Sequence, residues 1–310
     1  MIEGLDTSTN TVIEMRTTYR MMGIADFITL ANALFGSIAV FMLVLAVDGL
    51  HDPYGTGMKN QYIWAAVLFI ILSIIGDIID GPVARKYSKR RILGGSLDIM
   101  SDCLSFCFAP ALMIFVMFGR MGSATPFWTV ILAIGCCWLI ATGMLRLARF
   151  AHEEGGYAPH FNGLSSPASA LLLMSLSLFI WLQPSTGIGP SLSSWDCNPL
   201  CFGKGGDKPY FDFLIFPFML IAGAMMISDR KLPKLKSGWP LYASIAQMLC
   251  LLIATIIMMI HIFRGGDAYD LGISRIAAAL LLTSFILVLF YFILGPFVVA
   301  QELQEQTSEE

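Results

Sequence analysis

The sequence predicts an all-α, polytopic membrane protein, and three observations support this fold class. Hydrophobic residues make up 56% of the 310-residue chain, charged residues only 13%, and the mean hydropathy is +0.73. A soluble domain usually carries about 25% charged residues. The apolar residues also gather in runs of roughly 20, the length that a helix needs to cross a bilayer. We therefore expect lipid as the solvent and no nucleic-acid partner.

Eight apolar stretches are expected to form transmembrane helices, with Gly- and Pro-containing breaks between them. They cover residues 27–47, 62–80, 95–118, 127–146, 167–183, 210–228, 239–263 and 275–300. We expect a single membrane domain made of an N-terminal segment (1–26), the beginning of a core (27–183), an outer loop (184–209), the remaining helices (210–300) and an acidic tail (301–310). The outer loop contains Cys197 and Cys201, and the sequence leaves open whether they form a disulfide.

The basic residues predict the orientation, because loops rich in Lys and Arg stay in the cytoplasm. With the N-terminus inside, thirteen basic residues are cytoplasmic: Arg16, Arg20, Arg85, Lys86, Lys89, Arg90, Arg91, Arg146, Arg149, Arg230, Lys231, Lys234 and Lys236. Six lie outside: Lys59, Arg120, Lys204, Lys208, Arg264 and Arg275. This asymmetry favours an even number of spans, with both termini on the cytoplasmic side of the cell membrane.

Four aspartates lie in the second and third predicted spans, where an ionised group costs several kcal/mol unless it is compensated. Asp77 and Asp80 share one helix face, and Asp98 and Asp102 share a face of the next helix. Carboxylates that converge in a small volume need protons or cations to neutralise them. Oxygen ligands of this kind suit Mg²⁺ or Mn²⁺. The alternative of separate ion pairs with nearby arginines does not explain both spacings.

Small residues follow the first pair of aspartates. Gly81 and Ala84 leave room for a bulky ligand beside the helix, and Arg85 is a fixed cation suited to phosphate oxygens. This arrangement indicates a site for a metal-bound nucleotide diphosphate. A divalent-ion transporter is a second interpretation, but the later spans offer no comparable acids to pass an ion across the membrane.

The run Asp77-x2-Asp80-Gly81-x2-Ala84-Arg85-x8-Gly94-x3-Asp98-x3-Asp102 resembles the signature of the CDP-alcohol phosphatidyltransferases. The resemblance implies a six-helix core with two divalent ions at a site facing the cytoplasm, and often a homodimer. It implies that all four aspartates are metal ligands and that Asp102 is also the general base. It further implies a CDP-lipid site formed by Asp77, Gly81, Ala84, Arg85 and Gly94. Arg91 is either a nucleotide or lipid contact or a membrane-surface charge.

Segments outside this motif are similar to phosphatidylserine synthases. One is Phe27 to Gly36, in which Asn32 is either a contact to the donor lipid or an interhelical hydrogen-bond partner. Another is Leu145-Arg146-Leu147-Ala148-Arg149-Phe150, followed by a Gly-Leu-x-x-Pro-Ala segment from Gly163. Arg146 and Arg149 could hold the carboxylate of serine or could simply anchor the helix end at the membrane.

These features predict transfer of a phosphatidyl-type group from CDP-diacylglycerol or CDP-archaeol to serine, with release of CMP. The sequence leaves glycerol 3-phosphate or inositol phosphate as alternative acceptors, because the aspartate motif does not distinguish among them.

Overall fold

Helices account for nearly all of the regular structure. The computed structural model describes residues 23–47, 60–87, 94–119, 126–153, 160–186, 214–233, 239–265 and 271–309. The predicted Cys197 and Cys201 loop lies outside these residues. The N-terminal helices are α2 (Ile24–Ala46), α3 (Asn60–Tyr87), α4 (Gly94–Asp102), the π-helix η1 (Cys103–Phe108), α5 (Ala109–Phe118) and α6 (Pro126–Glu153). The C-terminal helices are α7 (Ser166–Thr186), α8 (Ile215–Ile227), α9 (Trp239–Phe263) and α10 (Leu271–Glu309).

The predicted fold class is confirmed, since the described part of each of the eight predicted spans is mainly helical. Six helical segments of the described chain are long and apolar enough to cross a membrane, and α7 and α8 contribute shorter apolar helices. The third predicted span is one continuous helical segment, in which the π-helix η1 connects α4 to α5. Because a π-helical stretch changes the register of the residues around it, such stretches frequently occur at functional sites.

Several helices continue beyond the hydrophobic segments that predicted them. The helix α3 extends to Tyr87, α6 extends to Glu153, and α10 extends to Glu309 through the segment expected to be a separate tail. Hydropathy marks only the lipid-embedded part of a helix, whereas Ala, Arg, Gln and Glu favour helix in water as well. Helix ends are therefore set by backbone propensity, and membrane boundaries by hydropathy.

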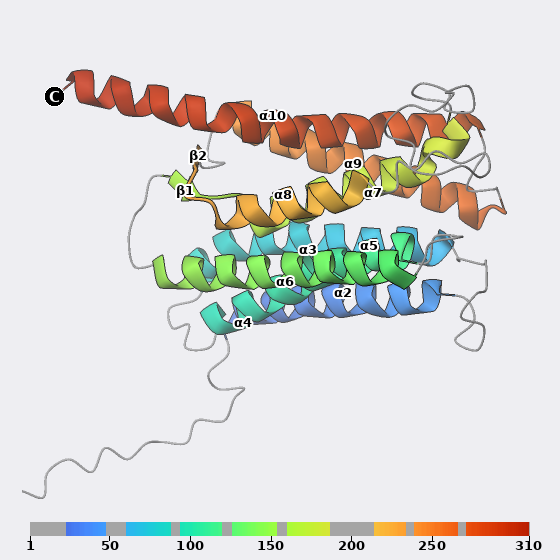
Figure 1. Ribbon diagram of the computed structural model, residues 1–310. Coiled ribbons are helices and arrows are strands. Elements are labelled where there is room, and N and C mark those ends of the chain that lie inside the picture. The colour runs from blue at the N-terminus through green and yellow to red at the C-terminus, as the bar shows by residue number, and fades with distance from the viewer. Residues whose placement is uncertain are drawn as a thin grey trace, which may run out of the picture.

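The helices form two layers (Figure 1). The layer formed by α2 to α6 lies below the layer formed by α7 to α10 in this view. Contacts of α9 with α3, of α8 with α6 and of α7 with α5 join the layers. Within the first layer α2 packs along α3 and also contacts α4 and η1. Fully buried side chains from both layers, among them Leu43, Trp64, Phe118 and Leu173, form a common core.

A short antiparallel ribbon, absent from the prediction, joins the connections that follow α6 and α8. Strand β1 (His160–Asn162) pairs with β2 (Lys231–Pro233) through Phe161 opposite Leu232. The Tyr291 hydroxyl of α10 donates a hydrogen bond to the Pro233 carbonyl at 3.0 Å. A Cβ at Gly295 would lie 2.8 Å from the Leu232 side chain, so this glycine permits the close approach of the ribbon to α10. Figure 1 shows the ribbon at the same end as the start of α4.

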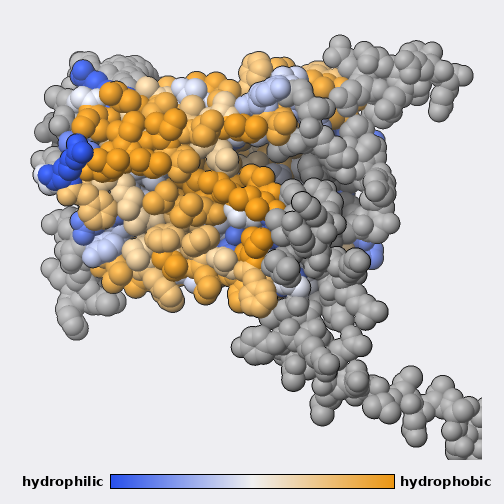
Figure 2. Space-filling view, turned by 180° about the vertical axis from the view of Figure 1, so that it is seen from behind, coloured by the Kyte–Doolittle hydropathy of each residue, from blue (hydrophilic) through white to orange (hydrophobic). Residues whose placement is uncertain are grey.

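The outer surface of the helices is apolar. Figure 2 shows a wide hydrophobic band over the face opposite to that of Figure 1. Large hydrophobic side chains stay exposed on several helices, including Phe41, Ile134, Phe263 and Phe297, each more than 60% exposed. Such an extensive apolar surface would be unfavourable in water, and it indicates a multi-pass protein embedded in lipid.

Candidate active site

Three of the four predicted aspartates come together. Asp77 of α3 and Asp98 and Asp102 of α4 each offer one carboxylate oxygen, and these three oxygens lie within 4.8 Å of one another. All three side chains are half-buried. Carboxylates this close repel one another strongly unless a cation lies among them. An all-oxygen donor set fits a hard divalent cation such as Mg²⁺ or Mn²⁺, so these residues are suited to the predicted metal.

Asp80 lies beside this trio, against helix α2. Its side chain is only 3% exposed, and one carboxylate oxygen accepts a hydrogen bond from the hydroxyl of Thr29. Asp80 is nevertheless close enough to Asp77 for their charges to repel. The sequence predicts that all four aspartates are metal ligands, whereas the structure groups three of them and bonds the fourth to a neighbouring helix.

Asn32 lies at the contact between three helices. Its backbone carbonyl accepts hydrogen bonds from Ser73 of α3 at 3.1 Å and from Ser105 of η1 at 3.4 Å. Its side-chain amide occupies the space where a Cβ at Gly76 would stand, so only glycine fits there. Both hydrogen bonds go to the backbone carbonyl, so the two interpretations of the Asn32 side chain, a contact to the donor lipid and an interhelical hydrogen bond, stay predictions.

The predicted CDP-binding residues are only partly described. The backbone of Gly81, Ala84 and Arg85 forms the last turns of α3, but their side chains lie outside the described part of the structure. Arg91 falls between α3 and α4, outside the described residues. Gly94 is buried at the first position of α4. The predicted nucleotide contacts therefore stay predictions.

Arg146 of α6 is a buried cation beside the carboxylates. It is 9% exposed, and its guanidinium is close enough to Asp102 for the opposite charges to attract each other. One terminal nitrogen donates a hydrogen bond to the Ser166 hydroxyl of α7 at 2.9 Å. The Nε donor is also buried, and it has no hydrogen-bond partner among the described residues. Burial of an unused donor is costly, so this atom is suited to a bound ligand.

A close helix contact brings Arg146 to this position. Gly143, one turn earlier on α6, faces Cys107 of η1, and a Cβ at Gly143 would overlap with the cysteine side chain. The absence of a side chain at Gly143 lets α6 approach the π-helix that directly follows Asp102. The motif and the later arginine thereby come together, although they are 44 positions apart in the sequence.

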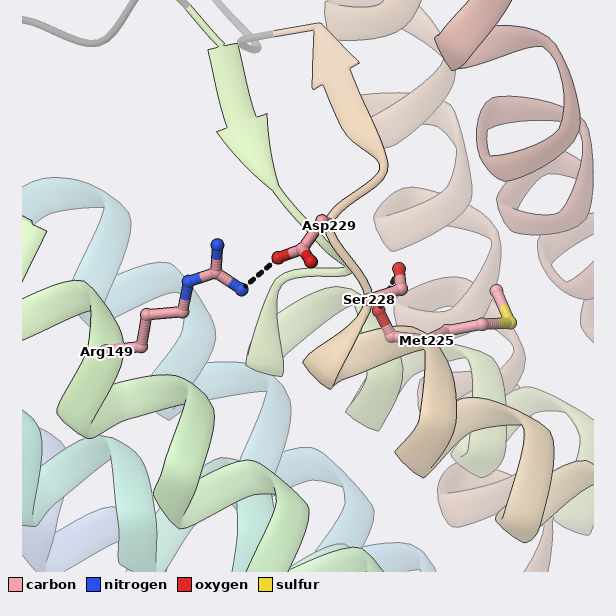
Figure 3. A network of polar contacts seen from close by, with 4 residues as sticks. All are labelled: Arg149, Met225, Ser228 and Asp229. Carbon is pink, nitrogen blue, oxygen red and sulfur yellow. Dashed lines mark hydrogen bonds and ion pairs between the residues drawn. The ribbon is translucent and has the colours of Figure 1, made fainter.

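Arg149 has a different environment, although it lies only one turn from Arg146. Its guanidinium forms an ion pair with Asp229 at 2.7 Å, on the connection between α8 and β2 (Figure 3). Arg149 is 36% exposed and Asp229 is 85% exposed. Ser228, next to Asp229, is the C-cap residue of α8. Its hydroxyl donates a hydrogen bond to the Met225 carbonyl at 3.0 Å. The structure thus places the two predicted acceptor residues at different contacts.

Sequence reasoning missed the partners of the predicted residues. Thr29, Ser105, Ser166 and Asp229 each contact a predicted residue from a distant segment. Two of them had a sequence signal: Thr29 lies three positions before Asn32 and therefore on the same helix face, and Ser166 lies within the Gly-Leu-x-x-Pro-Ala segment.

Comparison with known proteins identifies the family. The sequence pattern of the CDP-alcohol phosphatidyltransferases matches residues 22–197, which is more than half of the chain. The chain belongs to the CDP-alcohol phosphatidyltransferase family. The matched region contains α2 to α7, and therefore all four aspartates and both arginines.

Three curated relatives with serine in their names are similar to this family member. CDP-diacylglycerol--serine O-phosphatidyltransferase of Saccharomyces cerevisiae is 30% identical over 166 residues, which are 51% of this chain and 54% of the relative. Archaetidylserine synthase of Methanothermobacter thermautotrophicus is 29% identical over 159 residues, which are 51% of this chain and 58% of the relative. CDP-diacylglycerol--serine O-phosphatidyltransferase of Methanocaldococcus jannaschii is 28% identical over 239 residues, which are 76% of this chain and 86% of the relative. The chain thus spans little more than half the length of the first two relatives.

Proposed function

We propose that this family member transfers a phosphatidyl-type group from a CDP-lipid to the hydroxyl of L-serine and releases CMP. The observation that supports serine is the position of Arg146, a buried cation close to Asp102 whose Nε donor has no hydrogen-bond partner among the described residues. Serine carries both a carboxylate, which an arginine binds well, and the hydroxyl that must react. Membership in the family and the names of the relatives support the same reaction.

The proposed reaction joins the serine oxygen to phosphorus and breaks the bond between that phosphorus and the bridging oxygen of the pyrophosphate. Asp102 would accept the hydroxyl proton as a general base within hydrogen-bond reach. Asp77, Asp80, Asp98 and Asp102 would hold two Mg²⁺ or Mn²⁺ ions. When bound, such ions neutralise charge on the pyrophosphate and on the leaving CMP. Arg146 would bind the serine carboxylate and orient its hydroxyl toward Asp102.

We also propose that the site lies at the cytoplasmic side of the cell membrane. The excess of basic residues in the segments assigned to that side supports this orientation. The start of α4 and the C-terminal part of α10 lie at the same end of the structure (Figure 1). An even number of spans between these two segments would place both on the same side of the membrane. The predicted homodimer stays a prediction.

The test is a CMP-release assay on the full-length protein purified in detergent. Given CDP-diacylglycerol and Mn²⁺ or Mg²⁺, the protein should release CMP when L-serine is added, and the lipid product should contain serine. CDP-archaeol in a parallel reaction tests whether the donor chains are esters or ethers. Release only with glycerol 3-phosphate or inositol phosphate would overturn the serine assignment. Metal uptake into vesicles without CMP release from any acceptor would instead support the transporter interpretation.

A further inference from the structure

Helix α2 contributes no predicted metal ligand, yet its polar residues contact both helices that do. The hydroxyl of Thr29 donates to the carboxylate of Asp80, and the Thr29 side chain is fully buried. Asn32 lies one turn later on the same face, and its backbone carbonyl accepts hydrogen bonds from Ser73 and Ser105. We call Thr29 and Asn32 the α2 polar face.

The contacts of the α2 polar face flank the carboxylates on both sides. Ser73 lies one turn before Asp77 on α3, and Ser105 lies three positions after Asp102 in η1. Helix α2 is hydrogen-bonded to α3 and to η1 and packs against α4, so it helps to fix the position of α3 relative to α4 and η1. Glycine makes the packing possible at two points, since a Cβ at Gly76 would overlap with Asn32 and a Cβ at Gly36 would overlap with Ser105.

The geometry points to Thr29 as a positioning residue of the metal site, which acts by holding the Asp80 carboxylate in one orientation. This inference rests on the proposed divalent-metal site. Asp80 lies close enough to Asp77 for their charges to repel, and the bond from Thr29 holds the Asp80 carboxylate against α2 in opposition to that repulsion. A hydroxyl that donates to one carboxylate oxygen fixes the plane of the group, and such bonds to ionised acceptors are strong.

Hydrogen-bond partners of metal ligands have large measured effects. Their removal typically weakens metal affinity or activity by about 10- to 100-fold. Thr29→Val keeps the branched shape of the side chain and removes only the donor, so packing against α3 is largely retained. Thr29→Ser keeps the donor and removes a methyl group. The two variants therefore separate the hydrogen bond from the packing.

The first experiment measures Mn²⁺ binding to the purified full-length protein by electron paramagnetic resonance, with no substrate present. We expect the Kd for Mn²⁺ to rise about 10-fold or more in Thr29→Val and to return close to the wild-type value in Thr29→Ser. The matched control is Ser37→Ala, because the Ser37 hydroxyl on the same helix donates within α2, to the Ala33 carbonyl at 2.9 Å. That variant should bind Mn²⁺ as the wild type does.

The second experiment repeats Thr29→Val in an Asp80→Asn background, in which we expect Asp77, Asp98 and Asp102 to bind Mn²⁺ more weakly than in the wild type. If Thr29 acts through Asp80, its removal should add nothing there. In the CMP-release assay the single variant should lower kcat and leave the KM for serine nearly unchanged, because the acceptor contacts are intact.

Three outcomes would overturn the inference. The first is wild-type Mn²⁺ affinity in Thr29→Val. The second is an equal loss in the presence and absence of the Asp80 carboxylate, which would make the role of Thr29 one of general packing. The third is the absence of Mn²⁺ binding by the wild-type protein, which would refute the proposed metal site itself. The measurement on the wild-type protein separates this outcome from the first two, in which the wild type binds Mn²⁺.

Discussion

Hydroxyl groups behave differently in two regions of this membrane domain. Around the carboxylates, Thr29, Ser73 and Ser105 donate hydrogen bonds from one helix to another. In α7 and α9, by contrast, Ser175, Ser177 and Thr255 donate to carbonyls four positions earlier in their own helix.

The difference separates two uses of a polar side chain in lipid. A bond within a helix satisfies the hydroxyl and does little to place that helix against its neighbours. A bond between helices fixes their relative position, and it is worth about 0.6 kcal/mol on average in membrane proteins. Cross-helix bonds of hydroxyl groups lie beside the site where three carboxylate oxygens are within 4.8 Å of one another, so they can hold the helices that carry these carboxylates in register.

The largest expected effect is that of Asp102→Asn. The amide keeps the shape of the side chain but is not a base, so CMP release should fall by about 10²- to 10⁴-fold. Binding of CDP-diacylglycerol, measured at equilibrium, should change less. Thr255→Ala, which removes a hydroxyl bonded only within α9, is the control and should keep normal turnover. Wild-type rates for Asp102→Asn would refute the role of this residue as a base.

Arg146 and Arg149 provide the next test, because the sequence treats them alike and the structure does not. Arg146→Gln should raise the KM for serine about 10- to 100-fold, the value of one or two charge-assisted hydrogen bonds. Arg149→Gln should leave that KM nearly unchanged, since Arg149 is paired with Asp229. Steady-state kinetics with varied serine at saturating CDP-lipid measure both values. Equal effects of the two substitutions would indicate that both arginines contact the acceptor.

Substitutions at Gly76 and Gly95 test the close contact between α2 and α3. Gly76→Ala should lower the free energy of unfolding in detergent by about 1–3 kcal/mol, the usual cost of overpacking. The reason is that the new methyl group would overlap with Asn32. Gly95→Ala is the matched control, since a Cβ there meets nothing within 4 Å, and it should be neutral or slightly stabilising. Thermal unfolding followed by circular dichroism compares the two. A stable Gly76→Ala variant with full Mn²⁺ binding would argue against close packing of α2 on α3.

The smallest expected effect belongs to the ion pair between Arg149 and Asp229. Exposed pairs contribute about 0.2–1 kcal/mol, and Asp229 is 85% exposed. A double-mutant cycle of Arg149→Ala and Asp229→Ala, read by thermal unfolding, should give a coupling energy in this range that decreases at high salt. A coupling energy well above it would show that the connection between α8 and β2 is held more rigidly than its exposure suggests.

Most of the helical architecture was predictable because lipid imposes a simple rule on composition. The eight apolar stretches correspond to helices, and departures occur mainly at ends such as that of α3, where the helix continues into water. The β1–β2 ribbon was not predictable, since three-residue strands carry too little pattern and depend on partners such as Tyr291.

The sequence by itself determined the fold class, the family and the identity of the carboxylates, because each depends on local composition or on spacing along one or two helices. Only the tertiary structure decided which groups meet. It grouped Asp77 with Asp98 and Asp102, tied Asp80 to Thr29, and brought Arg146 rather than Arg149 close to Asp102. The physical reason is that helix periodicity determines the face on which a side chain lies, whereas its partners depend on how closely neighbouring helices pack, which here depends on glycines at their contacts.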